Sequence, residues 1–327
     1  MKTIRLAVTK KCNLRCKHCY SSSTDSPHVN ELSTEEIKAL ITDIAHLGFG
    51  EIAFSGGEPL LRSDIYDLID HAQNTGLLTS LITNATILSL ETTQWLKNAG
   101  VKKLIISIHG ASSKVHDEFS RHEGSFERTK LGIRNAAQVG IPFHITTCIH
   151  HQNIQDVDSI LSLAENLGAC NVEIENFFPV GRGKEHPELT LHPGEKKDLV
   201  DRILEHYSER NLTFRLWGIP QFSVGLVKKG RTEDKSLGCM AARTFCFISY
   251  EGTVYPCMFL RKEGGNIRRE RLSDIWNGSE VFRKLRGRKL SGKCGRCEFR
   301  ELCGGPRCVV WEKTGSLEKE DSDCWYY

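Results

Sequence analysis

Three cysteines near the amino end have the spacing of an iron–sulfur site. Cys12, Cys16 and Cys19 follow directly after a short apolar stretch. A four-iron cluster is normally held by four thiolates, so three thiolates leave one iron without a protein ligand. A vacant position of this kind can take a small molecule, whereas a closed site serves structure or electron transfer. The alternative is a zinc site completed by His18 or by a distant residue.

A turn with two glycines is the second feature that could bind a ligand. The sequence FSGGEP at positions 54–59 ends an apolar, β-prone run. Gly56 and Gly57 carry no Cβ and would let the backbone approach a ligand, and Glu58 could pair with an ammonium group. The alternative is a plain strand-to-helix turn that ends at a proline.

Composition favours metal sites over disulfides. The chain has 327 residues, of which 13 are cysteine, and 44 Lys and Arg against 41 Asp and Glu. The net charge of +3 gives no reason to expect a nucleic-acid or anionic membrane partner. No stretch reaches about eighteen apolar residues, and the amino end has no signal-peptide core. We therefore expect a cytoplasmic protein, in which clustered cysteines indicate bound metal.

Repeated strand-then-helix units must position these residues. A capping box at 33–36 opens the first expected helix, and a helical pattern follows nearly every expected strand. Six such units predict a parallel α/β sheet with right-handed crossovers, either doubly wound or a barrel lacking some strands. Ligands bind at the carboxyl ends of such strands, where both candidate features lie. The expected strands are Thr3–Thr9, Glu51–Ser55, Leu78–Thr83, Lys103–Ile108, Phe143–Ile149 and Asn171–Phe177.

The pattern of expected strands and helices changes in the last third of the sequence. Beyond about Thr213 the rhythm breaks down into short strands, turns and cysteines. We expect a barrel-like domain at 1–220 and a cysteine-rich domain at 221–327, packed closely because no long linker separates them.

The amino-terminal motif resembles that of the radical S-adenosylmethionine (SAM) superfamily. The CxxxCxxC of Cys12, Cys16 and Cys19, flanked by His18 and Tyr20, is similar to the family motif. The resemblance implies a partial (β/α)6 TIM-like barrel and a cluster whose open iron binds the methionine end of SAM. It also implies reductive cleavage of SAM to a 5′-deoxyadenosyl radical, which takes a hydrogen atom from the substrate, and sensitivity to air.

The same resemblance implies a set of SAM contacts. The GGEP at 56–59 is similar to a family motif, and further contacts come from the ends of the third and fourth strands. His109 stands where many relatives carry Asp, and an unligated loop histidine is the alternative there. A solvated helix-end side chain is the alternative for Arg121. The implied SAM-binding residues are Gly56, Gly57, Glu58, Asn84, Ser107, His109, Arg121 and His18.

The carboxyl-terminal cysteines resemble the SPASM extension, which carries two auxiliary four-iron clusters. Two departures are visible: Cys246 is additional, and Cys303 and Cys308 are one residue further apart than in the usual pattern. The competing interpretation is a zinc ribbon of Cys294, Cys297, Cys303 and Cys308. The resemblance implies three clusters in all, with Cys239, Cys246, Cys257 and Cys308 on the first auxiliary cluster and Cys294, Cys297, Cys303 and Cys324 on the second.

Two cysteines remain outside these sets. Cys148 lies in the fifth expected strand and Cys170 at the start of the sixth. We expect both to act as small buried apolar side chains.

The resemblance implies an enzyme and leaves its substrate open. Chains with this extension mostly mature ribosomally made peptides by crosslinking or side-chain oxidation, which is the expectation here. The alternative is oxidative decarboxylation of a tetrapyrrole in alternative haem or haem d1 synthesis, which the sequence around 293–305 and 314–324 also resembles. A small metabolite is the remaining substrate class. Arg182 could pair with a carboxylate of either a peptide or a tetrapyrrole, and an ordinary turn arginine is the alternative for it. A low-potential donor such as ferredoxin or flavodoxin would supply electrons.

A function of another class is a non-catalytic iron–sulfur electron carrier or a zinc-binding module. The GGEP turn and the β/α rhythm speak against it, because a carrier needs neither an open iron nor a methionine pocket.

Overall fold

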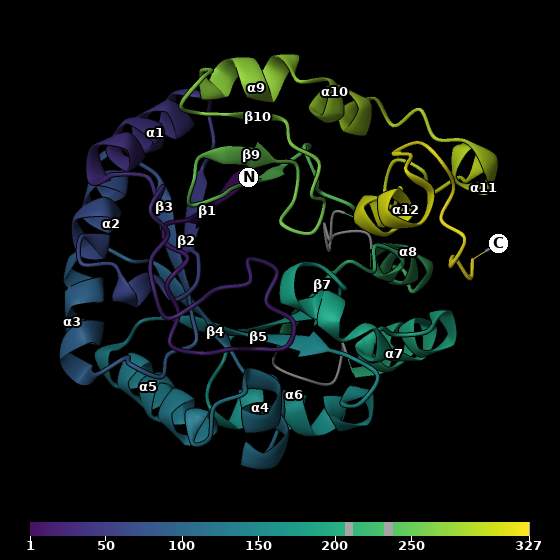
Figure 1. Cartoon of the computed structure of the whole chain (residues 1–327). Helices are drawn as coiled ribbons and strands as arrows, with labels where there is room; N and C mark the ends of the chain where they lie inside the picture. Colours follow the sequence, from purple (N-terminus) through teal and green to yellow (C-terminus); the bar gives the residue numbers. More distant parts are fainter. Residues whose placement is uncertain (207–211, 232–237, 327) are drawn as a thin grey trace.

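The computed structural model describes residues 1–206, 212–231 and 238–326, and its centre is a curved parallel sheet with helices around the outside (Figure 1). The strands that carry the site run parallel, each hydrogen-bonded to the next, from β1 to β7. This is the partial barrel that the sequence predicts. Its strands are β1 (Thr3–Ala7), β2 (Glu51–Ser55), β3 (Leu78–Thr83), β4 (Lys103–Ser107), β5 (Phe143–Ile149), β6 (Asn171–Asn176) and β7 (Thr213–Trp217).

The helices pack against the outer face of the sheet, and the first of them begins where the sequence predicts. In α1 the Ser33 hydroxyl accepts the Glu36 N–H at 3.2 Å, and the Ser33 N–H reaches the Glu36 carboxylate at 2.8 Å. This confirms the predicted capping box. The helices around the barrel are α1 (Thr34–His46), α2 (Ile65–Asn74), α3 (Leu90–Asn98), α4 (Ser113–Ser120), α5 (Ser125–Val139), α6 (Val157–Asn166), α7 (Pro193–His206) and α8 (Gln221–Lys228).

The expectation that the β/α rhythm stops at Thr213 is wrong. β7 begins at Thr213 and pairs in parallel with β6. The strand is short, and only two of its five residues, Phe214 and Leu216, are buried. An exposed edge strand of this kind gives a weak apolar signal, which explains why the sequence pattern misses it.

The carboxyl-terminal region extends the same sheet. β8 (Phe245–Ile248) pairs in parallel with β1, and β9 (Thr253–Tyr255) and β10 (Gly265–Asn266) continue antiparallel from it. The two predicted domains therefore share one sheet, with the strand order β10-β9-β8-β1-β2-β3-β4-β5-β6-β7. The remaining helices are α9 (Leu272–Gly278), α10 (Glu280–Gly287), α11 (Gly292–Arg296) and α12 (Arg307–Thr314).

Alternation along β1 separates two environments. Ile4 and Leu6 are fully buried in the main apolar core under the helices. Arg5 points to the other face, where it lines the cavity inside the barrel. Because neighbouring parallel strands share this alternation, residues in register with Ile4 and Leu6 face the outer core and residues in register with Arg5 face the interior. Among the described residues we find no helix with the length and apolar character needed to cross a membrane.

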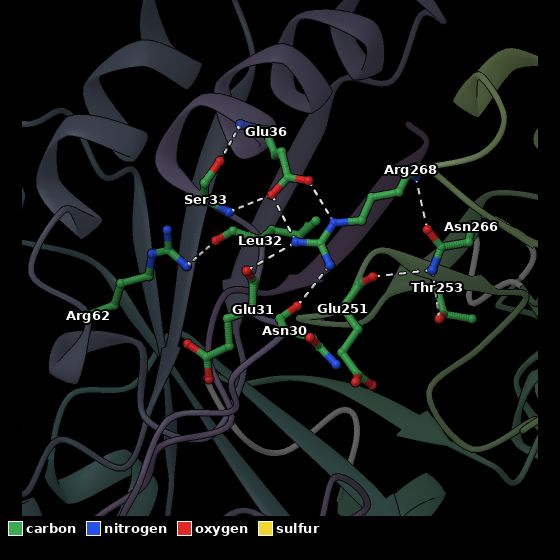
Figure 2. Close-up of polar contacts among 10 residues, drawn as sticks. All are labelled: Asn30, Glu31, Leu32, Ser33, Glu36, Arg62, Glu251, Thr253, Asn266 and Arg268. Carbon is green, nitrogen blue, oxygen red and sulfur yellow. Dashed lines mark hydrogen bonds and ion pairs between the residues drawn. The ribbon is translucent and has the colours of Figure 1, made fainter.

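Arg268, from the carboxyl-terminal region, binds residues at the start of α1 and in the loop before it (Figure 2). The Arg268 guanidinium donates to both carboxylate oxygens of Glu36, at 2.6 and 2.9 Å. It also donates to the carbonyls of Asn30 and Glu31, at 3.0 and 3.2 Å. The bonds from Arg268 to the Glu36 carboxylate, together with the one from the Ser33 N–H, hold the pKa of Glu36 low, at about 2. The contact joins the segment after β10 to the loop that follows the three cysteines.

Replacing Arg268 tests this contact. We expect Arg268→Ala to lower stability by about 1 kcal/mol, the upper range for an exposed ion pair, and to lower the thermal midpoint of the cluster-loaded protein by about 1–2 °C. Arg268→Lys keeps the charge but loses the two-pronged geometry, so an intermediate midpoint is expected. Midpoints equal to wild type in both variants would show that the contact contributes nothing.

Candidate functional site

The three amino-terminal cysteines line one cavity at the carboxyl ends of the barrel strands. Cys12, Cys16 and Cys19 lie in the loop after β1, on the wall of one cavity. Burial, followed by the nearby Glu58 carboxylate, raises the pKa of Cys12 to about 12. Burial and the other two thiolates raise the pKa of Cys16. A positively charged metal centre would favour the thiolate forms, so this group of sulfurs fits a metal cluster.

A distant arginine holds the cysteine loop in place. Arg182 donates to the carbonyl of Cys16 at 3.0 Å and to that of Ser23 at 2.5 Å, and its backbone N–H donates to the carbonyl of Cys19 at 3.0 Å. Gly181 has a φ of +56°, and a Cβ there would lie 2.4 Å from the Cys19 carbonyl oxygen. The prediction that Arg182 meets a substrate carboxylate is not supported, because the guanidinium is buried and occupied by the loop.

The two glycines after β2 are needed for a different reason from the one expected. A Cβ on Gly56 would lie 2.5 Å from the Thr9 carbonyl oxygen, and one on Gly57 would lie 2.1 Å from that of Lys11. The Gly57 N–H donates to the Thr9 carbonyl at 2.7 Å. Both glycines line the cavity, but it is the close approach of the cysteine loop that excludes a side chain.

Glu58 lies behind the cavity wall. It is fully buried, and its carboxylate accepts the Thr83 hydroxyl and the Asn84 N–H at 2.8 Å each and the Leu60 N–H at 3.2 Å. Burial raises its pKa to about 7. In this structure Glu58 orients the end of β3, and Asn84 faces the cavity beside it.

The two predicted histidines, His18 and His109, meet at the cavity with His116, which was not predicted. Burial lowers the pKa of His18 to about 3, that of His116 to about 4 and that of His109 well below its usual value, so the rings are neutral. The Nδ1 atom of His109 accepts the Cys148 N–H, and that of His116 accepts the His109 N–H, both at 3.1 Å. The rings of His109 and His116 therefore carry their proton on Nε2.

Unpaired polar atoms in this wall fit a polar ligand such as SAM. Among the described residues, His116 Nε2, His18 Nδ1 and Thr146 Oγ1 have no hydrogen-bond partner although they are buried. Buried groups of this kind normally find a partner, which the hydroxyls or base of a bound nucleoside could supply. Ser107 also lines the cavity.

The structure does not bring Arg121 to this site. Arg121 ends α4 in a left-handed conformation, is exposed, and lies with its Nη2 atom 2.7 Å from His186 Nε2. Its expected contact with the SAM carboxylate is therefore not supported, because the helix ends with this side chain turned toward the surface.

The sequence reasoning also missed two charged residues in the cavity wall. Arg5 and Glu175 face each other across the barrel interior, with 3.8 Å between Arg5 Nη1 and Glu175 Oε1. Burial raises the pKa of Glu175, and Arg5 opposes that rise. A signal was present, since a charged residue in the middle of an apolar strand such as TIRLA needs a partner or a function.

The second auxiliary set converges as predicted. Cys294, Cys297, Cys303 and Cys324 line one cavity near the carboxyl end. Burial and the thiolates of Cys324 and Cys294 raise the pKa of Cys303 to about 12. Cys308 lies elsewhere, beside Cys239 and Cys257. The zinc-ribbon grouping is therefore not the one that the chain adopts.

Two glycines between Cys303 and Cys308 let the chain turn, so the additional residue there fits without displacing Cys308. Gly304 and Gly305 both take left-handed conformations, with φ of +67° and +65°. Pro306 follows and caps α12, whose first turn carries Cys308. The inserted residue therefore does not move Cys308 away from Cys239 and Cys257.

Three other cysteine predictions meet different outcomes. Cys246 lies in the outer core and does not line the cavity of Cys239, Cys257 and Cys308. Cys148 is buried, as predicted, beside Phe119 and Phe177. The expectation that Cys170 is buried is wrong: it is exposed, because it stands at the rim of the sheet before β6 begins.

Comparisons with known proteins agree with this geometry. A family model described as "Radical SAM superfamily" matches residues 6–164, and one described as "Iron-sulfur cluster-binding domain" (SPASM) matches residues 239–298. An AdoMet-dependent heme synthase of Methanosarcina barkeri is 35% identical over 98% of this chain and 95% of its own length. The chain belongs to the radical SAM superfamily. It is a radical SAM enzyme, with a SAM-binding four-iron cluster and SPASM auxiliary clusters.

Other relatives in the superfamily have different names. A PqqA peptide cyclase of Bradyrhizobium diazoefficiens is 29% identical over 98% of this chain and 85% of its own length. Streptococcus suis SuiB bound to S-adenosylmethionine superposes with a TM-score of 0.79 at 18% identity, covering 99% of this chain and 77% of that one. Native anSMEcpe with bound AdoMet gives 0.75, also at 18%, covering 97% and 92%. These two structures share the fold.

A variant of Glu58 tests its role in positioning. Glu58→Gln keeps the side-chain volume but places an amide N–H₂ group opposite the N–H and O–H donors that Glu58 now accepts. We expect this to destabilise the turn that presents Asn84 by about 1–3 kcal/mol. SAM affinity, measured by anaerobic equilibrium dialysis, should fall about tenfold or more with the iron content unchanged. Glu127→Gln, an exposed change on α5, is the control. Unchanged SAM affinity in Glu58→Gln would contradict this role.

A second variant tests the amino-terminal cluster. Cys16→Ala removes one of three thiolates, so we expect it to abolish release of 5′-deoxyadenosine from SAM and to leave the auxiliary iron in place. Nucleoside release is followed by chromatography after anaerobic reduction, together with iron content. Cys170→Ala, at an exposed cysteine outside all three groups, should behave as wild type. Full activity in Cys16→Ala would overturn the assignment.

Proposed function

We propose that this enzyme oxidatively decarboxylates propionate side chains of an iron porphyrin to vinyl groups. The observation that carries the proposal is similarity over nearly the whole chain: three relatives named AdoMet-dependent heme synthase are 35%, 33% and 32% identical over 98–99% of this chain. A relative named Fe-coproporphyrin III synthase is 29% identical. Haem carries two vinyl groups where iron coproporphyrin III carries two propionates, so decarboxylation is the chemistry that links them.

The cavity offers a cation for a carboxylate substrate. Arg5 is 5% exposed, and its Nε atom has no hydrogen-bond partner among the described residues. Its contact with Glu175 is longer than a hydrogen bond. Trp217 and Phe245 pack over the guanidinium at 5.6 and 6.0 Å, which limits access of water to it. A buried guanidinium with free donors suits two-pronged binding of a carboxylate.

The reaction balances with these parts. When bound, the reduced cluster and SAM supply a 5′-deoxyadenosyl radical, which removes one hydrogen atom from the propionate carbon next to the ring. The carboxylate then leaves as carbon dioxide, one electron leaves with it, and a vinyl group remains. The part played by Arg5 is to bind the carboxylate and fix the carbon to be oxidised; the histidine donors orient the nucleoside.

The leftover electron needs an acceptor, for which we propose the auxiliary clusters. Two auxiliary clusters and the SAM cluster make three four-iron clusters, so we expect about twelve irons in the loaded protein. A ferredoxin or flavodoxin is the expected low-potential donor to the SAM cluster.

Peptide maturation, the substrate class expected from sequence, has weaker support. The PqqA peptide cyclases are 28–29% identical and a relative named mycofactocin maturase MftC is 31% identical, over 81–86% of their own lengths. Two solved structures with a bound peptide share only the fold with this chain, at 19% identity each.

The direct test offers both substrate classes to the reconstituted enzyme. With SAM and a strong reductant under anaerobic conditions, iron coproporphyrin III should lose carbon dioxide and gain vinyl groups, seen by mass spectrometry, in step with 5′-deoxyadenosine. Arg5→Gln should weaken porphyrin binding about 10–100-fold, the usual loss for a charged hydrogen bond. Its nucleoside release without porphyrin should be unchanged, and Arg5→Lys should be intermediate. No porphyrin product, with modification of a cysteine-rich precursor peptide instead, would reject the proposal.

A further inference from the structure

The first auxiliary group contains three neighbouring thiols. Cys239, Cys257 and Cys308 line one cavity between β7, β8 and the start of α12. The chain therefore brings these three thiols to the same wall.

Cys246, the expected fourth ligand, points the other way. In the parallel pairing of β8 with β1, Cys246 stands beside Ile4, and side chains at paired positions lie on the same face. Ile4 is fully buried in the outer core, and so is Cys246. Phe245, on the opposite face of β8, lines the cavity with the other three cysteines. The thiol of Cys246 therefore lies across the strand from them.

The aromatic residues of β8 agree with this placement. To face the cavity, β8 would have to slip by one residue against β1, which would also move Phe245 and Phe247 out of the aromatic cluster inside the barrel. The strand pairing thus excludes Cys246 as a ligand.

The rest of the cavity wall offers no substitute. Within the described residues, the polar side chains that line it besides the three cysteines are those of Arg215 and Trp217, and Met240 adds a thioether. A guanidinium and an indole N–H cannot act as metal ligands, and a thioether is a weak neutral one. Arg215 instead places a positive charge on the wall, which would favour an incoming anion.

We propose that Cys246 is not a ligand of the first auxiliary cluster, that Cys239, Cys257 and Cys308 are the ligands that the described residues supply, and that the fourth iron is open to an external anion, such as a carboxylate. Trp217 and Phe245, whose rings lie 5.4 Å apart, separate this iron from Arg5 and the SAM cavity. This inference goes beyond the porphyrin reaction and does not depend on it, since the vacancy follows from the pairing of β8.

The first experiment removes Cys246 in a protein that holds only auxiliary clusters. The background is the full chain with Cys12→Ala, Cys16→Ala and Cys19→Ala. Adding Cys246→Val, or Cys246→Ala as a smaller change, should leave about eight irons and the same electron paramagnetic resonance spectrum on reduction. Cys257→Val, at a half-buried cysteine of the same region, should change the spectrum or lose iron. Loss of iron or a changed spectrum in both Cys246 variants would overturn the proposal.

The second experiment asks where an external anion binds. Isotope-labelled cyanide is added to the reduced background protein, and its coupling to an iron is sought by electron–nuclear double resonance. We expect coupling in the background protein and equally in Cys246→Val, because the iron is open in both. Coupling that appears only after Cys246→Val would show that Cys246 had filled the position. Absence of coupling in both proteins would also reject the open iron. Neither readout uses a porphyrin, so these outcomes are separate from those that test the proposed function.

Discussion

The site depends on the close packing of the loop after β1 against the turn after β2. Backbone touches backbone here: the Gly57 N–H binds the Thr9 carbonyl, and the Glu58 N–H binds the Lys11 carbonyl at 2.8 Å. No Cβ fits at Gly56 or Gly57. The packing fixes the direction in which the cysteine loop leaves the sheet. It also buries Glu58, so the carboxylate must find donors, and those donors are the residues that end β3.

This contact therefore also positions the neighbouring segments, because the polar groups that it buries must find hydrogen-bond partners there. A buried carboxylate without partners would be costly, and three donors on Glu58 remove that cost while placing Asn84. Arg182, brought from the far end of the barrel by β6, gives the cysteine loop two more bonds at its carbonyls. The cysteine loop is thus held from β2 on one side and from the segment after β6 on the other.

Features that are set by a few neighbouring residues were predicted correctly from the sequence. Features that depend on which face of a strand a residue takes, or on distant partners, were not. The three amino-terminal cysteines, the GGEP turn and the capping box at Ser33 are read within a few residues, and each is where the sequence predicts. The role of Arg182 could not be predicted, because its partners at Cys16 and Ser23 are more than 150 residues away in the chain. Arg121 depends on how one helix ends.

Cys246 shows most clearly what cysteine spacing alone does not predict. Its spacing from Cys239 and Cys257 is compatible with a ligand, but spacing does not say which face of a strand a residue takes. That is set by the register of β8 on β1, a pairing between residues about 240 positions apart. The same register that withdraws Cys246 also presents Phe245 and Phe247 to the interior, where they pack with Trp217 and Tyr20. A strand that met the ligand pattern fully would have lost this aromatic layer.

The aromatic layer explains why the two kinds of metal site can work next to each other. Trp217 and Phe245 lie between the cavity of Arg5 and the cavity of Cys239, Cys257 and Cys308, and each lines or packs against both. Their rings therefore separate the two cavities. The alternation of β1 and β8 decides three things together: which face Arg5 takes, which cysteines line the second cavity, and which side chains stand between the two.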